Sequence, residues 1–422
     1  MKSDLRFRRI LNIAIPISLA NATIPILGAV DTGVIGQTGD PVLIAAVSVG
    51  AIIVSVSFWV FGFLRMGTTG LASQARGELD NFELVSILLR GIIVGLLSGC
   101  ILIIAQGPLI SGSLKIFQAA ADVETLATDY FKIRIWSAPF SISTFAMIGW
   151  LLAMERTKTI LLLQLTVNLL NIALDLYFVL GLSWGVKGVA LASLLAEMFS
   201  FFSTLIFCCF ILLDFQLPKY SNVINFARWK KMFFVNINIF IRSIILESVI
   251  VSYIYFGSTF GTIALAANQI LLHFMNITAY ALDGLAFSAE VLVGISVGEK
   301  SRAKIREAAL KSTLLAAVGA SVLAALFFFL GPYFIIIMAR NSEIQGVANE
   351  YLFWMTLTPL TGVLSWMLDG VFIGATQTVY MRKAMIQSFI LYIVFITTFY
   401  PSFGNYGLWL SINLFLLHEL FV

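Results

Sequence analysis

Charged residues are scarce in this sequence. Lys, Arg, Asp and Glu make up 11% of its 422 residues, whereas hydrophobic residues make up 60%. Soluble domains carry roughly 25% charged residues, so this composition excludes a soluble globular protein and indicates that the solvent is lipid. The apolar residues come in runs of about 20, the length at which a helix crosses a bilayer. The repeating turn residues of a membrane β-barrel are missing.

Histidine and cysteine are also rare, with two and three copies. His273 and His418 have no metal-ligand partner at i+3 or i+4, and Cys100, Cys208 and Cys209 lie in apolar segments without the spacing of a metal site. No glycine-rich phosphate loop precedes a lysine. We therefore expect no metal, no cofactor, no enzymatic activity and no ATP hydrolysis. The net charge of +4 is dispersed over loops, so we expect no nucleic-acid partner.

Twelve apolar runs predict twelve membrane helices. They lie near residues 10–34, 42–66, 84–106, 130–153, 159–181, 188–213, 232–256, 263–290, 307–331, 347–375, 384–401 and 405–422. A polar stretch separates the sixth run from the seventh. We therefore predict an all-α polytopic membrane protein with an N-terminal six-helix lobe at 1–213, a cytoplasmic linker at 214–231 and a C-terminal six-helix lobe at 232–422.

Basic residues are distributed unevenly between the loops. Odd-numbered loops such as GQTGDP and PSFGNYG have almost none, whereas the N-terminus and the even-numbered loops are rich in them: Lys2, Arg6, Arg8, Arg9, Arg76, Arg156, Lys158, Lys219, Arg228, Lys230, Lys231, Lys300, Arg302, Lys304, Arg382 and Lys383. Basic loops stay on the cytoplasmic side. We expect a multi-pass protein of a bacterial inner membrane with both termini in the cytoplasm.

Landmarks of the first half recur in the second half at an almost constant offset in the numbering. Gly36 recurs as Gly257 and Gly77-Glu78 as Gly298-Glu299, both at an offset of 221 (257 − 36 and 298 − 77), and Pro139 recurs as Pro359 at an offset of 220. Each half has an even number of helices, so both halves share one orientation. We predict two lobes related by a pseudo-twofold axis along the membrane normal, the arrangement of transporters that alternate access between lobes.

The polar residues inside the predicted helices of the first half form the main candidate site. Asp31 lies in the first helix, and Asn168, Asn171 and Asp175 share one face of the fifth. Intramembrane acids are costly, by about 2.5–3.5 kcal/mol. Such oxygen atoms could bind a small cation, or share a proton because two buried carboxylates repel each other. A purely structural interhelical hydrogen bond is the alternative. In the repeat, Asp31 falls opposite Ser252 and Asp175 opposite Val394, so the acids are confined to one half.

Pro16 and Pro25 lie in the same predicted helix as Asp31. A proline removes a backbone hydrogen bond and favours a kink, so this helix could change its bend when Asp31 is neutralised. Prolines are also common in membrane helices without such a role.

The second half contains another set of charged residues within predicted helices. These are Arg242, Glu247, Asp283 and Asp369. A lone Arg in lipid is unfavourable, so we expect Arg242 to pair with one of these acids. The set is interpreted either as a structural ion-pair network or as a second substrate or cation site.

Because we expect no ATP hydrolysis by this chain, an ion gradient is the expected energy source. The membrane potential supplies about 2.3 kcal/mol per charge per 100 mV. Asp31 is thus predicted to be a titratable group for a coupling ion, H+ or Na+.

The residues resemble the multidrug and toxic compound extrusion (MATE) family, most closely its DinF-like branch. The matching stretches include IAIPISLANATIPILGAVDTGVIG, FGFLRMGTTGLASQARG, NLLNIALDLYFV, ALDGLAFSAEVLVG and LDGVFIGATQT. They lie in order in both halves. The resemblance implies two six-helix lobes around a cavity and an antiporter that exports amphipathic, often cationic small molecules in exchange for H+ or Na+, working as a monomer.

The resemblance also assigns residues. It implies a coupling site of Asp31, Asn171, Asp175 and the hydroxyl of Ser193, with the bend proline of the first helix at Pro16. Many members have Thr where Ser193 stands, and Leu27 occupies a position where some members carry Tyr.

Two other functions are alternatives. A flippase of lipid-linked intermediates shares this architecture but needs a strongly cationic cavity, and Arg242 is the main intramembrane cation. A membrane-embedded enzyme needs histidine-containing or clustered-acid motifs, which we do not find.

Overall fold

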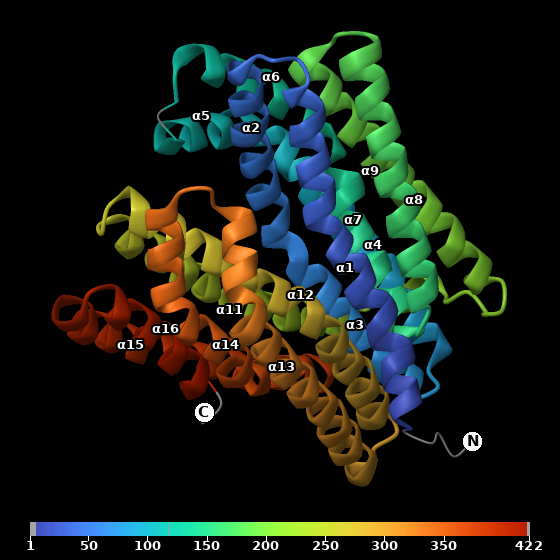
Figure 1. Cartoon of the computed structure of the whole chain (residues 1–422). Helices are drawn as coiled ribbons and strands as arrows, with labels where there is room; N and C mark the ends of the chain where they lie inside the picture. Colours follow the sequence, from blue (N-terminus) through green and yellow to red (C-terminus); the bar gives the residue numbers. More distant parts are fainter. Residues whose placement is uncertain (1–5, 118, 420–422) are drawn as a thin grey trace. The chain divides into compact units, whose positions relative to one another are not determined.

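The computed structural model describes residues 6–117 and 119–419 and is almost entirely helical (Figure 1). Single α-helices form the first, third and sixth predicted spans of the N-terminal half: α1 (Phe7–Gly36), α4 (Asn81–Ile104) and α9 (Gly185–Leu212). The other three spans contain irregular turns. They are α2 (Pro41–Trp59), 3-10 turn η1 (Val60–Gly62) and α3 (Phe63–Gly77); α6 (Ala121–Arg134), 3-10 turn η2 (Ile135–Ser137) and α7 (Ala138–Ala153); and α8 (Thr157–Asp175) with the π-helical segment η3 (Leu176–Gly181).

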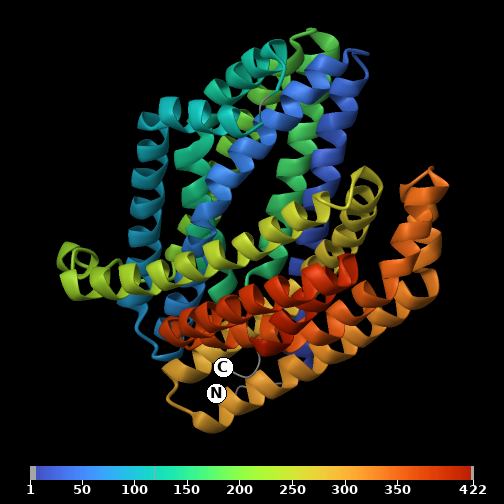
Figure 2. The same ribbon diagram turned by 90° about the vertical axis from the view of Figure 1, so that its left-hand side faces the viewer.

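In the part of the chain that the structure describes, the six helices of the C-terminal half have no such breaks, and four of them are longer than any α-helix of the N-terminal half. They are α11 (Phe226–Ser258), α12 (Thr262–Gly298), α13 (Arg302–Met338), α14 (Ser342–Gly374), α15 (Thr378–Phe403) and α16 (Asn405–His418). Helices α12, α13 and α14 pack against one another (Figure 2).

The helices confirm the predicted class, an all-α membrane protein with twelve transmembrane helices in two six-helix lobes. Within the described residues, eleven helical segments are long and apolar enough to cross a bilayer. The twelfth, α16, begins at Asn405 where the last span was predicted. Residues 420–422, the predicted end of that span, lie outside the described part of the chain, as does Lys2 of the basic N-terminus.

The helices differ from the apolar runs mainly at their ends. Helix α3 continues to Gly77 through the polar sequence GTTGLASQARG, and α11 begins at Phe226, inside the predicted linker. Hydropathy marks the bilayer core, whereas backbone hydrogen bonding continues into the headgroup region. Two short helices were not predicted: α5 (Gln106–Phe117) and α10 (Tyr220–Val223).

Contacts divide the chain into two compact units. One comprises Leu19–Met232, and the other joins the described residues up to Ser18 with those from Phe233 onward. The first part of α1 therefore packs with the C-terminal helices: Ser18 Oγ donates to the carbonyl of Ala281 at 2.9 Å, and Gly284 fits against Ala14. The predicted linker at 214–231 divides the spans by their order along the chain and does not consider this contact of α1.

Helix boundaries repeat with the predicted offset. Helices α2, α4, α6 and α8 begin at Pro41, Asn81, Ala121 and Thr157, and their counterparts α12, α13, α14 and α15 begin at Thr262, Arg302, Ser342 and Thr378, each at an offset of 221 (for example 378 − 157). The turns repeat as well. Non-glycine residues with positive φ occur at Leu79 and Lys300 and at Glu155 and Thr376, again with the same offset. These matched turns show an internal duplication at the level of backbone geometry.

The same offset corrects one sequence assignment. Because Thr157 and Thr378 begin equivalent helices, the counterpart of Asp175 is Ile396 and not Val394. The assignment to Val394 came from the shorter offset of the last loop. Asp31 still corresponds to Ser252, so the conclusion that the acids belong to one half is unchanged.

Small residues allow close helix crossings in both halves. Gly149 of α7 lies so close to α3 that a Cβ atom would overlap the carbonyl of Arg65, and Gly370 of α14 lies in the same way against the carbonyl of Ala286 in α12. The two glycines are related by the offset of the duplication, and so are the two residues whose carbonyls they approach. Membrane helices associate through such small-residue contacts.

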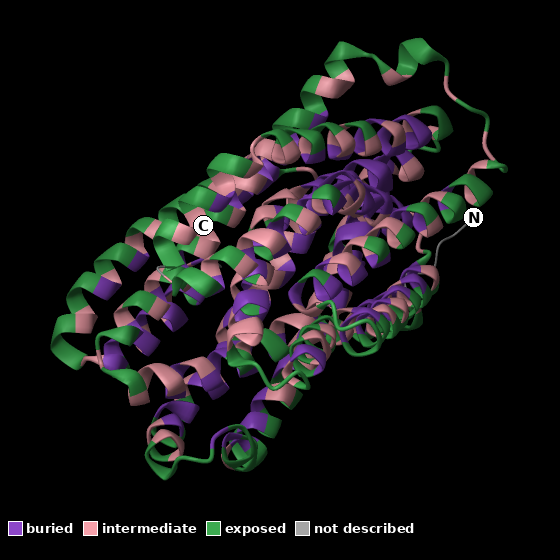
Figure 3. Ribbon diagram, turned by 90° about the horizontal axis from the view of Figure 1, so that it is seen from above, coloured by how far each residue is buried: buried purple, intermediate pink, exposed green. Residues whose placement is uncertain are grey.

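Exposed residues follow the outward faces of the helices (Figure 3), and many of them are large and apolar. Leu97 and Ile101 of α4 and Phe329 and Ile337 of α13 are each at least 60% exposed. A soluble protein does not tolerate so many exposed apolar side chains, and lipid is the environment that suits them.

Candidate functional site

The two acids of the N-terminal half lie next to each other. Asp31 comes from α1, and Asp175 is the last residue of α8 and is fully buried. Their carboxyl groups are close enough for one, when protonated, to donate a hydrogen bond to the other. Two residues that are far apart in the sequence thus form one carboxyl pair.

Apart from the contact between the two carboxyl groups, several polar atoms at this pair have no hydrogen-bond partner in the protein. Within the described residues these are Asp31 Oδ1, both Asp175 carboxyl oxygens and Asn171 Nδ2. Buried polar atoms are normally hydrogen-bonded, so this cluster fits a group that takes up a proton or a small cation with oxygen ligands. No set of three or more His, Cys, Asp or Glu that could hold a metal ion occurs among the described residues.

Asn168 lies on the same face of α8 but has a different role. Its Nδ2 donates to Thr23 Oγ1 of α1 at 2.8 Å, and its Oδ1 accepts from Gln164 Nε2 at 3.0 Å. It therefore holds α1 against α8 and leaves Asn171 and Asp175 as the polar groups of the pair.

The backbone changes its helical form at the acid. Asp175 ends α8, and the π-helical segment η3 follows directly. The equivalent α15 stays α-helical to Phe403. π-Helical turns are rare and often mark functional sites. This irregular segment lies in the lobe that carries the two acids.

The other predicted site residues are placed as follows. Ser193 of α9 is buried, but no hydrogen bond joins it to either acid in the described structure. Helix α1 is continuous through both prolines. Pro16 is buried and belongs to the C-terminal unit, whereas Pro25 is exposed and belongs to the N-terminal unit.

Sequence reasoning missed a buried ion pair near the acids. Arg134, at the end of α6, contacts Glu197 of α9 with a distance of 2.6 Å between Nη2 and Oε1. Arg134 lies just inside the start of the predicted fourth span, where a basic residue is usually interfacial. The available signal was Glu197, an acid in the middle of the sixth span without an assigned partner.

The charged set of the C-terminal half is only partly brought together. Arg242 pairs with Asp369, and its Nη2 lies 3.8 Å from Oε1 of Glu419, which the sequence did not single out. Asp283 is within electrostatic range of Arg242. Glu247, also in α11, shares no ion pair or hydrogen bond with them in the part of the chain that is described.

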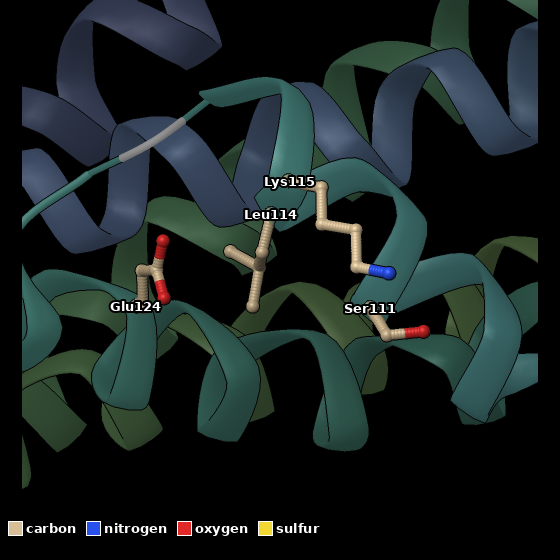
Figure 4. A pocket seen from close by; sticks show the side chains of 4 residues that line it. All are labelled: Ser111, Leu114, Lys115 and Glu124. Atoms are coloured by element: carbon tan, nitrogen blue, oxygen red, sulfur yellow. The ribbon is translucent and has the colours of Figure 1, made fainter.

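A recess of about 480 Å³ lies between α5 and α6 (Figure 4). Ser111, Leu114 and Lys115 of α5 and Glu124 of α6 line it. It contains none of the predicted site residues, and its side chains come from the connection between the third and fourth spans.

Two duplicated six-helix lobes with acids inside their membrane helices define a membrane transporter. The MatE family model matches residues 16–177 and 239–398, and the chain belongs to this family, the multidrug and toxic compound extrusion (MATE) transporters. Because the members of this family are transporters, the chain is a multi-pass transporter and not an enzyme.

The chain is similar to proteins from several bacteria. It is 31% identical to the "DNA damage-inducible protein F" of Escherichia coli K12, over 96% of this chain and 88% of the relative, which supports the DinF-like branch. It is 22% identical to the "Multidrug export protein MepA" of Staphylococcus saprophyticus, over 95% and 88%.

Solved structures share the fold. A "Crystal structure of MATE in the bent conformation" has a TM-score of 0.87 at 17% identity and covers 98% of this chain and 93% of that one. A structure of MATE "in the straight conformation" also has a TM-score of 0.87, at 17% identity, covering 98% and 94%.

Proposed function

We propose that this transporter is an antiporter that exports amphipathic, often cationic small molecules in exchange for H+ or Na+. The adjacent carboxyls of Asp31 and Asp175 carry this proposal, because they form an acidic pair at positions where the C-terminal lobe has Ser252 and Ile396. The export function is supported by relatives named as multidrug proteins, among them MepA and a "Probable multidrug resistance protein NorM" of Synechocystis.

The chemistry of coupling follows from the charge of the pair. Two adjacent carboxylates in a low-dielectric surrounding do not both stay ionised unless a proton or cation lies between them. Uptake of the ion removes charge from α1, the helix that carries Asp31 and both prolines. With Na+ as the ion, Asn171 and Ser193 would supply further oxygen ligands. No other cofactor is needed, since the gradient supplies the energy.

The alternative of a lipid flippase gains no support. Binding of a diphosphate needs free cationic groups, whereas Arg134 and Arg242 are each paired with an acid. The relatives do not favour this function either. We further propose that the protein lies in the inner membrane of a bacterium as a monomer with both termini in the cytoplasm.

Everted membrane vesicles test the function. An exporter loads such vesicles with a fluorescent organic cation such as ethidium when the vesicle lumen is made acidic or is filled with Na+. We expect loading with one of the two gradients and none after the gradient is dissipated. Loading that persists without any ion gradient, or its absence with both gradients, would overturn the proposed antiport.

A further inference from the structure

A buried cation, Arg134, is held by hydrogen bonds within electrostatic range of the carboxyl pair. Its Nη2 contacts Glu197 Oε1 at 2.6 Å, and its Nη1 donates to Ser137 Oγ at 3.0 Å. Ser141 donates to the second oxygen of Glu197. The Arg134 side chain is 9% exposed. Planar guanidinium and carboxylate groups held in this way have a fixed geometry.

The local backbone explains how Arg134 reaches this position. It is the last residue of α6, directly before the 3-10 turn η2. Ser137, at the end of this turn, donates to the Arg134 carbonyl at 2.7 Å and accepts from the Arg134 side chain. The equivalent α14 continues without a break. The turn thus holds the guanidinium against its own backbone.

The ion pair lies within electrostatic range of both acids. The positive charge of Arg134 is close enough to interact with the carboxyl groups of Asp31 and Asp175, and the Tyr130 hydroxyl lies beside Arg134. The titratable groups that face the site are therefore Asp31, Asp175, Tyr130, Arg134 and Glu197. When the acids are counted with this ion pair, the cluster carries one cation and up to three anions.

The internal duplication links the two pairs. Arg134 corresponds to Met355 of the C-terminal half at the offset set by the starts of α6 and α14. Gly188 and Gly407, which pack on the backbone of Phe178 and Phe399, set an offset of 219 (407 − 188) for the last helix, so Glu197 corresponds to Leu416. Both counterparts are buried apolar residues. At the positions equivalent to Arg134 and Glu197, the C-terminal lobe thus has two apolar side chains in place of an ion pair.

We infer that Arg134 and Glu197 are positioning residues that set the affinity of the Asp31–Asp175 pair for its coupling ion. This inference rests on the proposed antiport. The Arg134 cation favours the ionised acids and so opposes ion uptake, whereas Glu197 offsets this charge and keeps the guanidinium from binding the acids itself. The balance of the two charges keeps the pair able to bind and to release its ion.

The two charges predict shifts of opposite sign. Glu197→Gln can still accept from Arg134 through its amide oxygen, with Ser141 then accepting from the amide NH2, but it leaves the cation without its counter-charge. We expect the apparent affinity for the coupling ion to fall about tenfold, which is about 1.4 kcal/mol. Arg134→Gln should raise the affinity by a similar factor, and the double variant should return to within about threefold of the wild type.

The measurement is the H+ or Na+ concentration that gives half-maximal ethidium loading in everted vesicles. Ion-dependent thermal stability of the purified protein serves as a second measurement, because it does not need transport. If Arg134→Gln does not fold, the comparison of Glu197→Gln with the wild type still decides. An unchanged affinity in folded Glu197→Gln, or a rise in affinity, would overturn the inference.

A matched control removes another carboxylate from a buried arginine pair. Glu83 of α4 contacts Arg90 at 2.7 Å within the same unit. Glu83→Gln should leave the ion affinity unchanged, and a shift equal to that of Glu197→Gln would show a general effect of lost ion pairs and overturn the inference. Failure of the proposed function is separate: it would appear as ion-independent loading in the wild type.

Discussion

At the scale of single residues, the two halves differ at the positions of the acids. Asp31 corresponds to Ser252 and Asn171 to Tyr392, and in the C-terminal half these two hydroxyls form a neutral hydrogen bond of 2.8 Å. The third counterpart, Ile396, is buried and apolar. The C-terminal half thus has an uncharged hydrogen bond at the position where the N-terminal half has a pair of ionisable carboxyl groups.

We expect Asp31→Asn to abolish gradient-driven export while the protein still inserts and folds, because the amide keeps the shape but cannot titrate. Ethidium loading of everted vesicles at matched expression measures this. Ser252→Ala is the equivalent change in the other half and should keep export. Asp31→Asn transport at the wild-type rate would mean that Asp31 is only structural.

The neutral contact gives a prediction about stability. Tyr392→Phe removes the hydrogen bond to Ser252 but keeps the ring, which packs on Phe415. We expect a loss of about 1 kcal/mol, seen as a lower melting temperature in detergent, with no change in the ion concentration that half-saturates export. A change in ion dependence would instead give the C-terminal half a share in coupling.

At the scale of helices, close crossings depend on glycine. Gly149→Ala and Gly370→Ala should each destabilise the protein by about 1–3 kcal/mol through overpacking, because a Cβ atom would overlap a carbonyl of the neighbouring helix. Gly107→Ala in α5 is the control, since nothing lies within 4 Å of its added Cβ. It should be neutral or stabilising. Melting temperatures in detergent compare the three; equal effects would refute the packing argument.

A charged contact holds the linker between the halves. Arg90 of α4 is 1% exposed, pairs with Glu83, and donates to the carbonyls of Val223 and Asn222 of the linker at 3.2 and 3.4 Å. We expect Arg90→Gln to free this segment, seen as rapid proteolysis between residues 214 and 225. Arg228→Gln is the control, because the Arg228 side chain is 43% exposed and lies 3.6 Å from Glu83, and such pairs contribute little. Equal cleavage of both variants would exclude the anchor.

The sequence predicted elements better than their ends and their partners. Hydropathy located the twelve spans because each must be about 20 apolar residues long, but it could not find α5 or α10, which are short and partly polar. The acids Asp31 and Asp175 were found because charges within spans are rare. Arg134 was missed because its position near a span end is compatible with an interfacial residue, and only packing shows which way its side chain turns.

At the scale of the whole molecule, the duplication concerns turns as well as helices. Thr38 donates to the carbonyl of Ile35 after α1, and Thr259 donates to that of Phe256 after α11, so donors and acceptors are related by the same offset as the helices. When each of two duplicated lobes has an even number of helices, both lobes begin and end on the same side of the membrane. Equivalent turns of the two halves should therefore reach the same face of the membrane.

Cysteine labelling tests both this arrangement and the direction of insertion. We would replace Cys100, Cys208 and Cys209 and introduce single cysteines as Thr38→Cys, Thr259→Cys, Leu79→Cys or Lys300→Cys, all at exposed turn residues. Basic residues gather in the even-numbered loops and stay in the cytoplasm. We expect an impermeant maleimide added to whole cells to label positions 38 and 259 and to label 79 and 300 only after lysis. Opposite labelling of 38 and 259 would indicate inverted halves, and labelling of 79 and 300 in intact cells would reverse the orientation; in either case the cytoplasmic placement of both termini would be wrong.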